Sequence, residues 1–534
     1  MNDGGASLEL HELSIATAGD GDPLVTDLSL SLRAGEIFAL VGESGSGKSI
    51  TSLAAMRLLP EALRVSGGQA RLGGVDLLSL PEARMQSVRG RRMAMIFQNP
   101  MSGLNPVQTV FRQVAETLRL HTALRGRALR KRVTTLLAEV GIPDPQERLR
   151  FYPHQLSGGQ QQRVMIAMAL ACEPEVLIAD EPTTALDVTI QKQVLELLRS
   201  LARSRRLAVL LITHDMGVVR HSADRVAVLH QGRVLEEAPV DAFFAAPREP
   251  YSRRLIAALP DPDVFRPPLR APALLEVRGL RVHFERRAGL LRRVRSVTRA
   301  VDDVSLTIAR GETLALVGES GSGKSTLGRA VLGLEAVTDG AISFAGERLE
   351  HLWGRRRQPY RRRIQVIFQN PHSSMNPRLT VGDTIAEGML SLDVLPDATA
   401  RRRRVSELLA RVRLPAGFAG RYPHELSGGQ LQRIALARAL AVAPELIICD
   451  EPTSALDVSI RADILRLLAS IQEDDGVALL FITHDLSIVP GLAHRVAVMR
   501  DGRLVESGAT EAVLTAPTHP YTRELLAAVP RLSR

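Results

Sequence analysis

The sequence predicts an α/β protein made of two similar domains in tandem. Its 534 residues are too many for one hydrophobic core and suit two domains of about 250 residues each. Leu-Ser-Gly-Gly-Gln at 156–160 recurs at 426–430, a shift of 270 residues (426 − 156). The same shift relates four further motif residues of the first half, Asp180, Glu181, His214 and Tyr251, to Asp450, Glu451, His484 and Tyr521. A tandem duplication is the simplest explanation.

The boundary between the two copies is marked by proline. Five prolines lie between Pro260 and Pro272 with few apolar neighbours, which indicates a stiff connector. We therefore expect a first domain at residues 1–260, a linker at 261–272 and a second domain at 273–534.

Cysteine usage and hydropathy limit where the chain works. Cys172 and Cys449 are its only cysteines, far apart in sequence, so neither a disulfide framework nor a cysteine metal cluster is expected. The N-terminus is polar, and no stretch approaches 18 uninterrupted apolar residues. We expect a reducing compartment and a protein that is neither secreted nor inserted in a membrane.

The net charge of +10 raises the question of nucleic acid. The positive residues form short arginine clusters and aromatics are only 3% of the chain, so few side chains can stack on bases. Solvated helix faces, with some attraction to an anionic membrane surface, are the favoured interpretation. Only four of the 68 basic residues are lysine, and two of them, Lys48 and Lys324, close glycine-rich loops.

Those loops are phosphate-binding motifs. Strand-like runs at 37–41 and 313–317 each lead into GxxxxGK[ST] and a helix-compatible segment. Glycines let backbone N–H groups curl around a β-phosphate at a helix N-terminus. Each lysine would reach the β- and γ-phosphates of ATP, and Ser49 and Ser325 would hold Mg²⁺. The loop residues are Gly42, Glu43, Ser44, Gly45, Ser46, Gly47, Lys48 and Ser49, then Gly318, Glu319, Ser320, Gly321, Ser322, Gly323, Lys324 and Ser325.

Two apolar runs, at 176–181 and 446–451, end in paired carboxylates, where an α/β sheet presents ligands. Asp180 and Asp450 suit a Mg²⁺ partner. Glu181 and Glu451 suit a general base that orients water, because phosphoryl transfer needs mainly positioning and charge compensation. An isolated Asp-Glu would more simply be a solvated strand end, but the phosphate loops favour the catalytic interpretation.

Leu-Ser-Gly-Gly-Gln resembles the signature of ATP-binding-cassette (ABC) ATPases. The resemblance implies two tandem ABC-type P-loop domains, each with a RecA-like α/β core, an antiparallel β subdomain and a helical subdomain. It also implies roles for six residues: Gln98 and Gln369 as sensors of Mg²⁺ and water, His214 and His484 near the γ-phosphate, and Asp187 and Asp457 as D-loop aspartates.

Within the signature, Ser157 and Gly159 would open a helix whose N–H groups can meet a γ-phosphate. The resemblance implies that each signature contacts nucleotide held by the other domain. Residues 42–49 would then share a site with Ser427 and Gly429. The signature residues assigned to ATP are Ser157, Gly158, Gly159, Gln160, Ser427, Gly428, Gly429 and Gln430.

Two further patterns are similar to the peptide and nickel importer ATPases. Phe-Gln-Asn-Pro at 97–100 is followed by Leu-Asn-Pro at 104–106, with a matching pattern at 368–377. Each copy ends in a Pro-Tyr segment, at 250–260 and 520–530, which would also fit a plain terminal amphipathic helix.

The resemblance to that group implies a fused ATPase subunit of an importer for di- or oligopeptides or a related small solute. Its implied partners are two membrane permeases and, through them, a substrate-binding protein, with the chain peripheral on the cytoplasmic face. Segments 98–156 and 369–426 would receive the permeases. Nucleic acid is not expected as a partner.

Three alternatives are less favoured by the sequence. Soluble two-cassette translation or repair ATPases carry a long charged linker or zinc-binding cysteines, whereas the linker here is short and proline-rich. Fused sugar importers usually carry one degraded site, whereas both motif sets here are intact. Nickel or another small solute remains an alternative to peptide.

One difference separates the copies: Phe284 stands where ABC ATPases commonly stack an aromatic on adenine, and the matching stretch offers only Thr17. We expect weaker base recognition in the first site.

Overall fold

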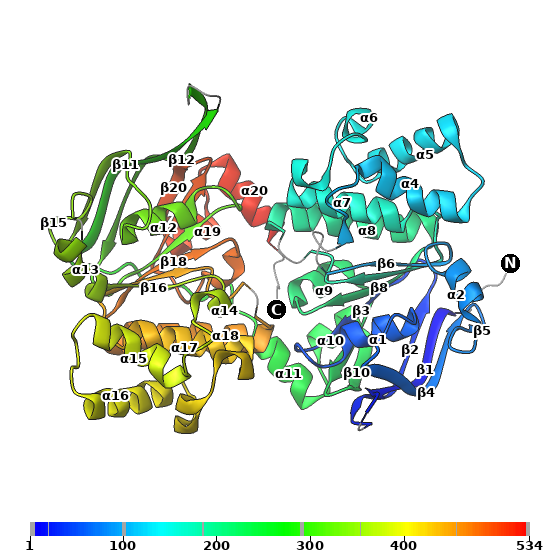
Figure 1. Ribbon diagram of the computed structural model, residues 1–534, viewed down its shortest axis with the longest axis horizontal. Coiled ribbons are helices and arrows are strands. Elements are labelled where there is room, and N and C mark those ends of the chain that lie inside the picture. The colour runs from blue at the N-terminus through cyan, green and yellow to red at the C-terminus, as the bar shows by residue number, and fades with distance from the viewer. Residues whose placement is uncertain are drawn as a thin grey trace. The chain divides into compact units, whose positions relative to one another are not determined.

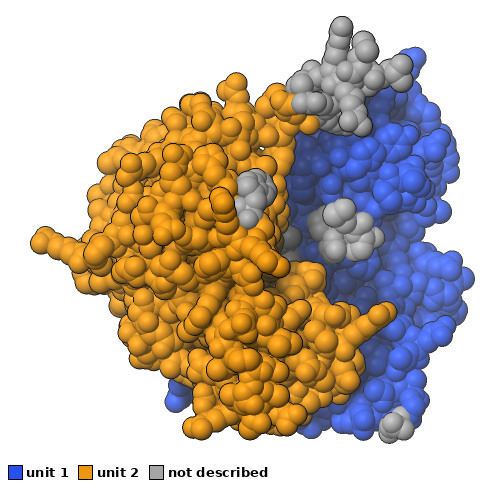
Figure 2. Space-filling view, turned by 60° about the vertical axis from the view of Figure 1, so that its left-hand side comes forward, with its two compact units in different colours: residues 1–258, 532–534 blue, residues 259–531 orange. Residues whose placement is uncertain are grey.

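The computed structural model describes residues 6–19, 21–98, 103–183, 186–288, 293–352, 354–454 and 456–529. The chain divides into two compact units, Met1–Ala258 and Leu259–Arg531. Figure 1 traces their elements and Figure 2 colours the two units. The two units meet between residues 258 and 259, two residues before the expected end of the first domain, and the expected linker 261–272 falls within the second unit. Each unit is described below by itself.

Each unit contains a six-stranded sheet with one antiparallel edge strand. In the first, the order is β10-β9-β3-β8-β7-β6, and all neighbours are parallel except β9 and β10. The strands are β3 (Ile37–Val41), β6 (Met93–Ile96), β7 (Val176–Asp180), β8 (Ala208–Thr213), β9 (Arg225–His230) and β10 (Arg233–Pro239). Strands β3, β7 and β8 read as unbroken apolar runs because both of their faces are buried.

The second unit repeats this sheet in the order β16-β17-β18-β13-β19-β20. Its strands are β13 (Thr313–Val317), β16 (Ile364–Ile367), β17 (Leu446–Asp450), β18 (Ala478–Thr483), β19 (Arg495–Arg500) and β20 (Arg503–Ala509). In both units the central strands run in parallel, so their carboxyl ends meet at one edge. That edge is where an open α/β sheet presents its ligands.

A second, antiparallel sheet lies in each unit. Its strands are β1 (Ala6–Thr17), β2 (Pro23–Arg33), β4 (Leu63–Leu72) and β5 (Val75–Asp76), then β11 (Ala273–Ala288), β12 (Arg293–Ala309), β14 (Asp339–Phe344) and β15 (Glu347–Arg348). Side chains of these sheets share a hydrophobic core with the parallel sheet and with the helix after the phosphate loop. This helix is α1 (Lys48–Ala55) or α12 (Lys324–Leu332).

Helices cover the other face of each parallel sheet (Figure 1). Buried apolar residues of α4, α5 and α7 form one core with β7 and β8, and α15, α16 and α17 do the same with β17 and β18. Besides α1 and α12, the described α-helices are, in the first unit, α2 (Glu82–Val88), α4 (Val110–His121), α5 (Gly126–Glu139), α6 (Pro145–Arg148), α7 (Gly158–Ala169), α8 (Val188–Arg205), α9 (Met216–Ser222), α10 (Val240–Ala245) and α11 (Pro250–Ala257). Those of the second are α13 (Gln358–Arg363), α14 (Pro371–Ser374), α15 (Val381–Ser391), α16 (Ala398–Arg411), α17 (Gly428–Leu440), α18 (Val458–Asp475), α19 (Thr510–Thr515) and α20 (Pro520–Ala528).

The proline-rich connector is anchored to the second unit. Arg266 donates from Nε to the carbonyl of Gly491 at 2.7 Å and pairs with Glu473 at 2.5 Å. Phe265 packs against the core that contains Tyr521 and Leu525. Part of the stiffness predicted from proline is therefore supplied by tertiary contacts. Among the described residues, no helix has the length and apolar character needed to cross a membrane.

Candidate functional site

The two phosphate loops follow β3 and β13 and have the same internal geometry. Lys48 Nζ donates to the carbonyls of Gly42 and Glu43 at 2.8 Å each. Lys324 Nζ donates to Gly318 and Glu319, also at 2.8 Å each. Both lysines are buried and start their helices. The ammonium groups thus lie over the loop backbone, beside the N–H groups that suit a phosphate.

The first glycine of each loop is required by sterics. Gly42 has φ 155°, and a Cβ there would lie 2.1 Å from the carbonyl oxygen of Leu229. Gly318 has φ 153°, with its Cβ position 2.2 Å from the carbonyl oxygen of Met499. The neighbouring strand, β9 or β19, therefore packs so closely against the loop that only glycine fits at this position.

The serine that closes each loop reaches the neighbouring strand. Ser49 Oγ donates to Asp180 Oδ1 at 3.1 Å, and Ser325 Oγ donates to Asp450 Oδ1 at 2.7 Å. Burial raises the pKa of both aspartates above the ordinary value. A carboxylate kept in such a place is stabilised by a cation. The hydroxyl and carboxylate oxygens are ligands that Mg²⁺ prefers, so these residues fit the metal.

A glutamate next to each aspartate is held by a glutamine and a histidine. Gln98 Nε2 donates to Glu181 Oε2 at 2.7 Å, and His214 Nδ1 lies 2.9 Å from Glu181 Oε1. The second unit repeats this arrangement with Gln369, Glu451 and His484 at 2.8 and 3.0 Å. The three residues come from different segments that follow β6, β7 and β8, or β16, β17 and β18, so the fold brings together what the sequence separates.

Electrostatics couple Glu451 to His484. Burial by itself would raise the pKa of Glu451, but the hydrogen bond and charge of His484 hold that pKa below its ordinary value. Burial likewise opposes charge on His484, yet Glu451 holds the pKa of the histidine above its ordinary value. The carboxylate therefore stays ionised and able to accept a proton from water.

Both glutamates have a strained backbone. Glu181 and Glu451 each have φ 47°, in the left-handed region that non-glycine residues rarely adopt. Each backbone N–H donates to the neighbouring strand, to Ile212 at 2.9 Å and Ile482 at 3.0 Å. These bonds hold the turn that aims the carboxylate at the glutamine and histidine.

The predicted signature helices begin as expected. Ser157 caps α7: its Oγ accepts from Gln160 N at 3.3 Å, and its own N–H donates to Gln160 Oε1 at 3.2 Å. Ser427 and Gln430 cap α17 in the same way at 3.4 and 2.9 Å. A Cβ on Gly159 or Gly429 would lie 2.5 Å from an isoleucine of the next long helix, Ile190 or Ile460. Close packing of the two helices therefore requires glycine at these positions.

The strand register supports the equivalence of Thr17 and Phe284. A residue with positive φ interrupts each first strand, Glu12 in β1 and Gly279 in β11, and Thr17 and Phe284 each follow it by five residues (17 − 12, 284 − 279). Phe284 is 43% exposed, whereas Thr17 Oγ1 accepts a hydrogen bond from Asp22 N at 3.0 Å. From Phe284 to Gly318 the second copy runs 34 residues (318 − 284), against 25 from Thr17 to Gly42 (42 − 17), and its strands β11 and β12 are longer than β1 and β2.

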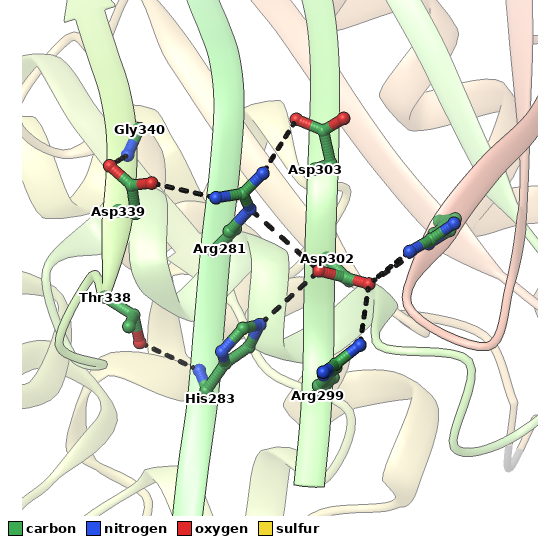
Figure 3. A network of polar contacts seen from close by, with 9 residues as sticks. Arg281, His283, Arg299, Asp302, Asp303, Thr338, Asp339 and Gly340 are labelled. Carbon is green, nitrogen blue, oxygen red and sulfur yellow. Dashed lines mark hydrogen bonds and ion pairs between the residues drawn. The ribbon is translucent and has the colours of Figure 1, made fainter. Parts of the chain in front are cut away.

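A polar network around Asp302 was not predicted from the sequence (Figure 3). Asp302 lies at its centre, 2.7 Å from Arg503 Nη2 and 3.5 Å from His283 Nε2. The hydrogen bonds from Arg503 hold the pKa of Asp302 below its ordinary value. Arg281 extends the network to Asp339 at 3.0 Å.

The first unit has uncharged residues at three of these positions: Ser14, Ala16 and Thr26 occupy those of Arg281, His283 and Asp302. This difference in charge between aligned positions of the two copies is the sequence feature from which the network could have been predicted.

Some motif residues lie outside the described residues. They are Asn99 and Pro100 after Gln98, Ala185 before the first D-loop aspartate, Ala455 before the second, and Pro530 in the second Pro-Tyr segment. Asp187 and Asp457 are described, and each precedes the first residue of a long helix, α8 or α18.

Comparison with known families follows the same division of the chain. Residues 25–184 and 301–454 match the family described as ABC transporter. Residues 235–275 and 505–534 match the C-terminal region of oligopeptide/dipeptide transporters. The second match covers the Pro-Tyr segments at 250–260 and 520–530.

Individual relatives match along nearly the whole length. The chain is 49% identical over 562 residues to the glutathione import ATP-binding protein GsiA of Escherichia coli O157:H7, covering 99% of this chain and 90% of that protein. Identity to the protein of that name from Salmonella paratyphi A is 47% over 561 residues, with coverage of 98% and 89%. Among solved structures, a dimeric post-hydrolysis state of an ATP-binding cassette with ADP and Pi aligns at TM-score 0.41 and 28% identity, covering 44% of this chain and 99% of that one.

Proposed function

We propose that this chain powers the import of short peptides. It belongs to the ABC transporter family, as a fused tandem ATPase subunit of the peptide-importer branch. The observation that carries this proposal is the occurrence, in one chain, of two complete phosphate sites and two peptide-transporter C-terminal regions. Relatives named glutathione import proteins favour a small peptide over nickel.

In this proposal each ATP is held by a phosphate loop and hydrolysed beside it. Lys48 or Lys324 neutralises phosphate charge, and Ser49 with Asp180, or Ser325 with Asp450, holds Mg²⁺. Glu181 or Glu451 accepts the proton of the attacking water, while Gln98 and His214, or their counterparts, keep that carboxylate aimed. The cation supplies charge compensation for the phosphates.

We infer further that ATP closes the two units on each other. Ser427 and Gly429 would then complete the site of Lys48, and Ser157 and Gly159 that of Lys324. The capped N-termini of α7 and α17 support this because they present N–H groups that suit a γ-phosphate. Fusion in one chain supplies each unit with its partner at high effective concentration.

An apolar groove in the second unit suits a permease segment at the cytoplasmic face of the membrane, and its lining residues, 331–368, come just before the segment 369–426 that was expected to receive the permease. The groove has a volume of about 220 Å³ and lies between the end of α12 and β16. Its lining includes Leu332, Leu334, Tyr360 and Phe368. Phe368 precedes Gln369, and α12 begins at Lys324, so a segment docked there would contact both elements that carry the ATP site.

The docking proposal is tested by substituting an exposed groove residue. Leu334 is 60% exposed, so Leu334→Asp should leave folding and ATP binding intact while reducing co-purification with the permeases severalfold. Val75→Asp, on the exposed β5 of the first unit, is the control. Equal permease recovery from both variants would refute the groove as the docking site.

The transport proposal is tested in vesicles reconstituted with this chain, its two proposed permease partners and a substrate-binding protein. Uptake of labelled glutathione and of a dipeptide should require ATP and be abolished by Glu451→Gln. Uptake of Ni²⁺ in the absence of any peptide uptake would overturn the peptide assignment.

A further inference from the structure

The C-terminal segment of the second unit reaches the phosphate loop. Helix α20 begins with Pro520, and the next residue, Tyr521, is buried with 2% of its surface exposed. The Arg500 guanidinium lies 4.6 Å from the centre of the tyrosine ring. These contacts fix the ring and therefore the position of its hydroxyl group.

That hydroxyl accepts a hydrogen bond from the phosphate loop itself. The N–H of Glu319, the second residue of the loop, donates to Tyr521 Oη at 3.2 Å. The carbonyl of Glu319 accepts from Lys324 Nζ at 2.8 Å. Glu319 is thus held on both sides, by the tail tyrosine at its amide and by the phosphate-loop lysine at its carbonyl.

The start of the tail helix is fastened to the same hairpin on which the loop packs. Glu506 of β20 accepts hydrogen bonds from the N–H groups of Thr518 and His519 at 2.7 and 3.1 Å. The preceding strand, β19, supplies the Met499 carbonyl that presses on Gly318. Hairpin, tail and loop therefore form one packed assembly.

We propose that Tyr521 is a positioning residue of the second ATP site, through which docking of the C-terminal tail sets the affinity of that phosphate loop for ATP. Tyr521 does not touch phosphate. It fixes the Glu319 peptide, so that the lysine and the later N–H groups start from the geometry that ATP needs. Because the loop is already ordered, it loses less conformational entropy when ATP binds.

The inference rests on the assignment of residues 318–325 to ATP, and the two can fail separately. Lys324→Ala tests the assignment, because ATP binding at the second site should then be lost. Tyr521→Phe tests the inference, because it removes one oxygen and keeps the ring on Arg500.

The experiment uses the full chain with Lys48→Ala, so that only the second site binds MgATP, measured by calorimetry. Tyr521→Phe should raise the Kd about two- to tenfold, which is the effect of losing one net hydrogen bond. Hydrogen exchange should quicken at the peptide containing Glu319 while α20 stays protected. Tyr251→Phe, the matched change in the first unit, should leave the second-site Kd unchanged.

A purely structural role would lower the melting temperature without changing the Kd, so an unchanged Kd overturns the proposal whatever the melting temperature. Glu506→Gln provides a second route, because it loosens the start of the tail and leaves Tyr521 intact. It should raise the second-site Kd in the same direction, whereas Glu236→Gln, at the corresponding anchor of the first tail, should not. Equal effects of these two variants on the second site would also overturn the proposal.

Discussion

In the first unit Gln98 Nε2 donates to Glu181 Oε2 at 2.7 Å. In the second unit Gln369 Nε2 donates to Glu451 Oε2 at 2.8 Å. The candidate catalytic groups of the two units thus have nearly the same geometry. The two units differ at other positions: Phe284 and the Asp302 network stand in the second unit where the first has Thr17 and uncharged residues. The geometry of the candidate catalytic groups is therefore the same in both copies, whereas the difference at Phe284 predicts that base recognition differs between them.

The largest expected effect tests whether both sites are catalytic. Glu181→Gln and Glu451→Gln keep the side-chain shape but remove the base, so each should lower ATP turnover with permeases present by about 10²-fold or more. Steady-state phosphate release measures it. Near wild-type turnover in either variant would show that the two units are not equivalent in chemistry.

The second prediction concerns the signature serines. Ser427→Arg should impair hydrolysis of ATP held by Lys48 by about tenfold or more, because a bulky cation would replace a small cap beside the γ-phosphate. Single-turnover hydrolysis in a Lys324→Ala background isolates that site. Unimpaired hydrolysis there would refute the cross-unit assignment, and Ser157→Arg is the matched variant for the other site.

The third prediction addresses the adenine side. A base–aromatic stack is worth about 1–3 kcal/mol, so Phe284→Ala should weaken ATP binding at the second site roughly five- to a hundredfold. Thr17→Phe should strengthen the first site. Binding of ATP and GTP is measured with one loop lysine disabled at a time. Equal affinity and equal preference for ATP over GTP at both wild-type sites would refute the predicted difference in base recognition.

The smallest effect concerns the Glu451–His484 pair. The pKa of His484 is raised in the folded protein, so its charged contribution to stability is complete below the ordinary pKa of 6.5 and is lost as pH rises through the raised value. Asp485 also favours the charged histidine, and Lys324 opposes it. The coupling free energy from a double-mutant cycle of Glu451→Gln and His484→Gln should therefore be larger near about pH 6 than near about pH 9. Urea unfolding of the four proteins measures it, and a coupling that grows with pH would contradict the assignment.

Local patterns determined most of the catalytic elements. The apolar runs that end at Val41 and Asp180 predict buried strands, and Ser157 with Gly159 predicts a helix start, because each depends only on neighbouring residues. Repetition of these patterns fixed the number of ATP sites. The ABC and peptide-importer membership was also legible in motifs spread along the chain.

Contacts between distant segments were decided only by the tertiary structure. Glu319 and Tyr521 lie 202 residues apart, and Arg503 and Asp302 lie 201 apart, so no periodicity or spacing links them. Likewise Arg266 of the connector meets Glu473 only because α18 folds back beside it. A sequence specifies which groups can form hydrogen bonds, but the packing of sheets and helices decides which of them come within reach. For this chain the sequence by itself therefore predicted the candidate catalytic groups of both units, because these lie in local motifs, and only the packing of the fold decided that the C-terminal tail contacts the second phosphate loop.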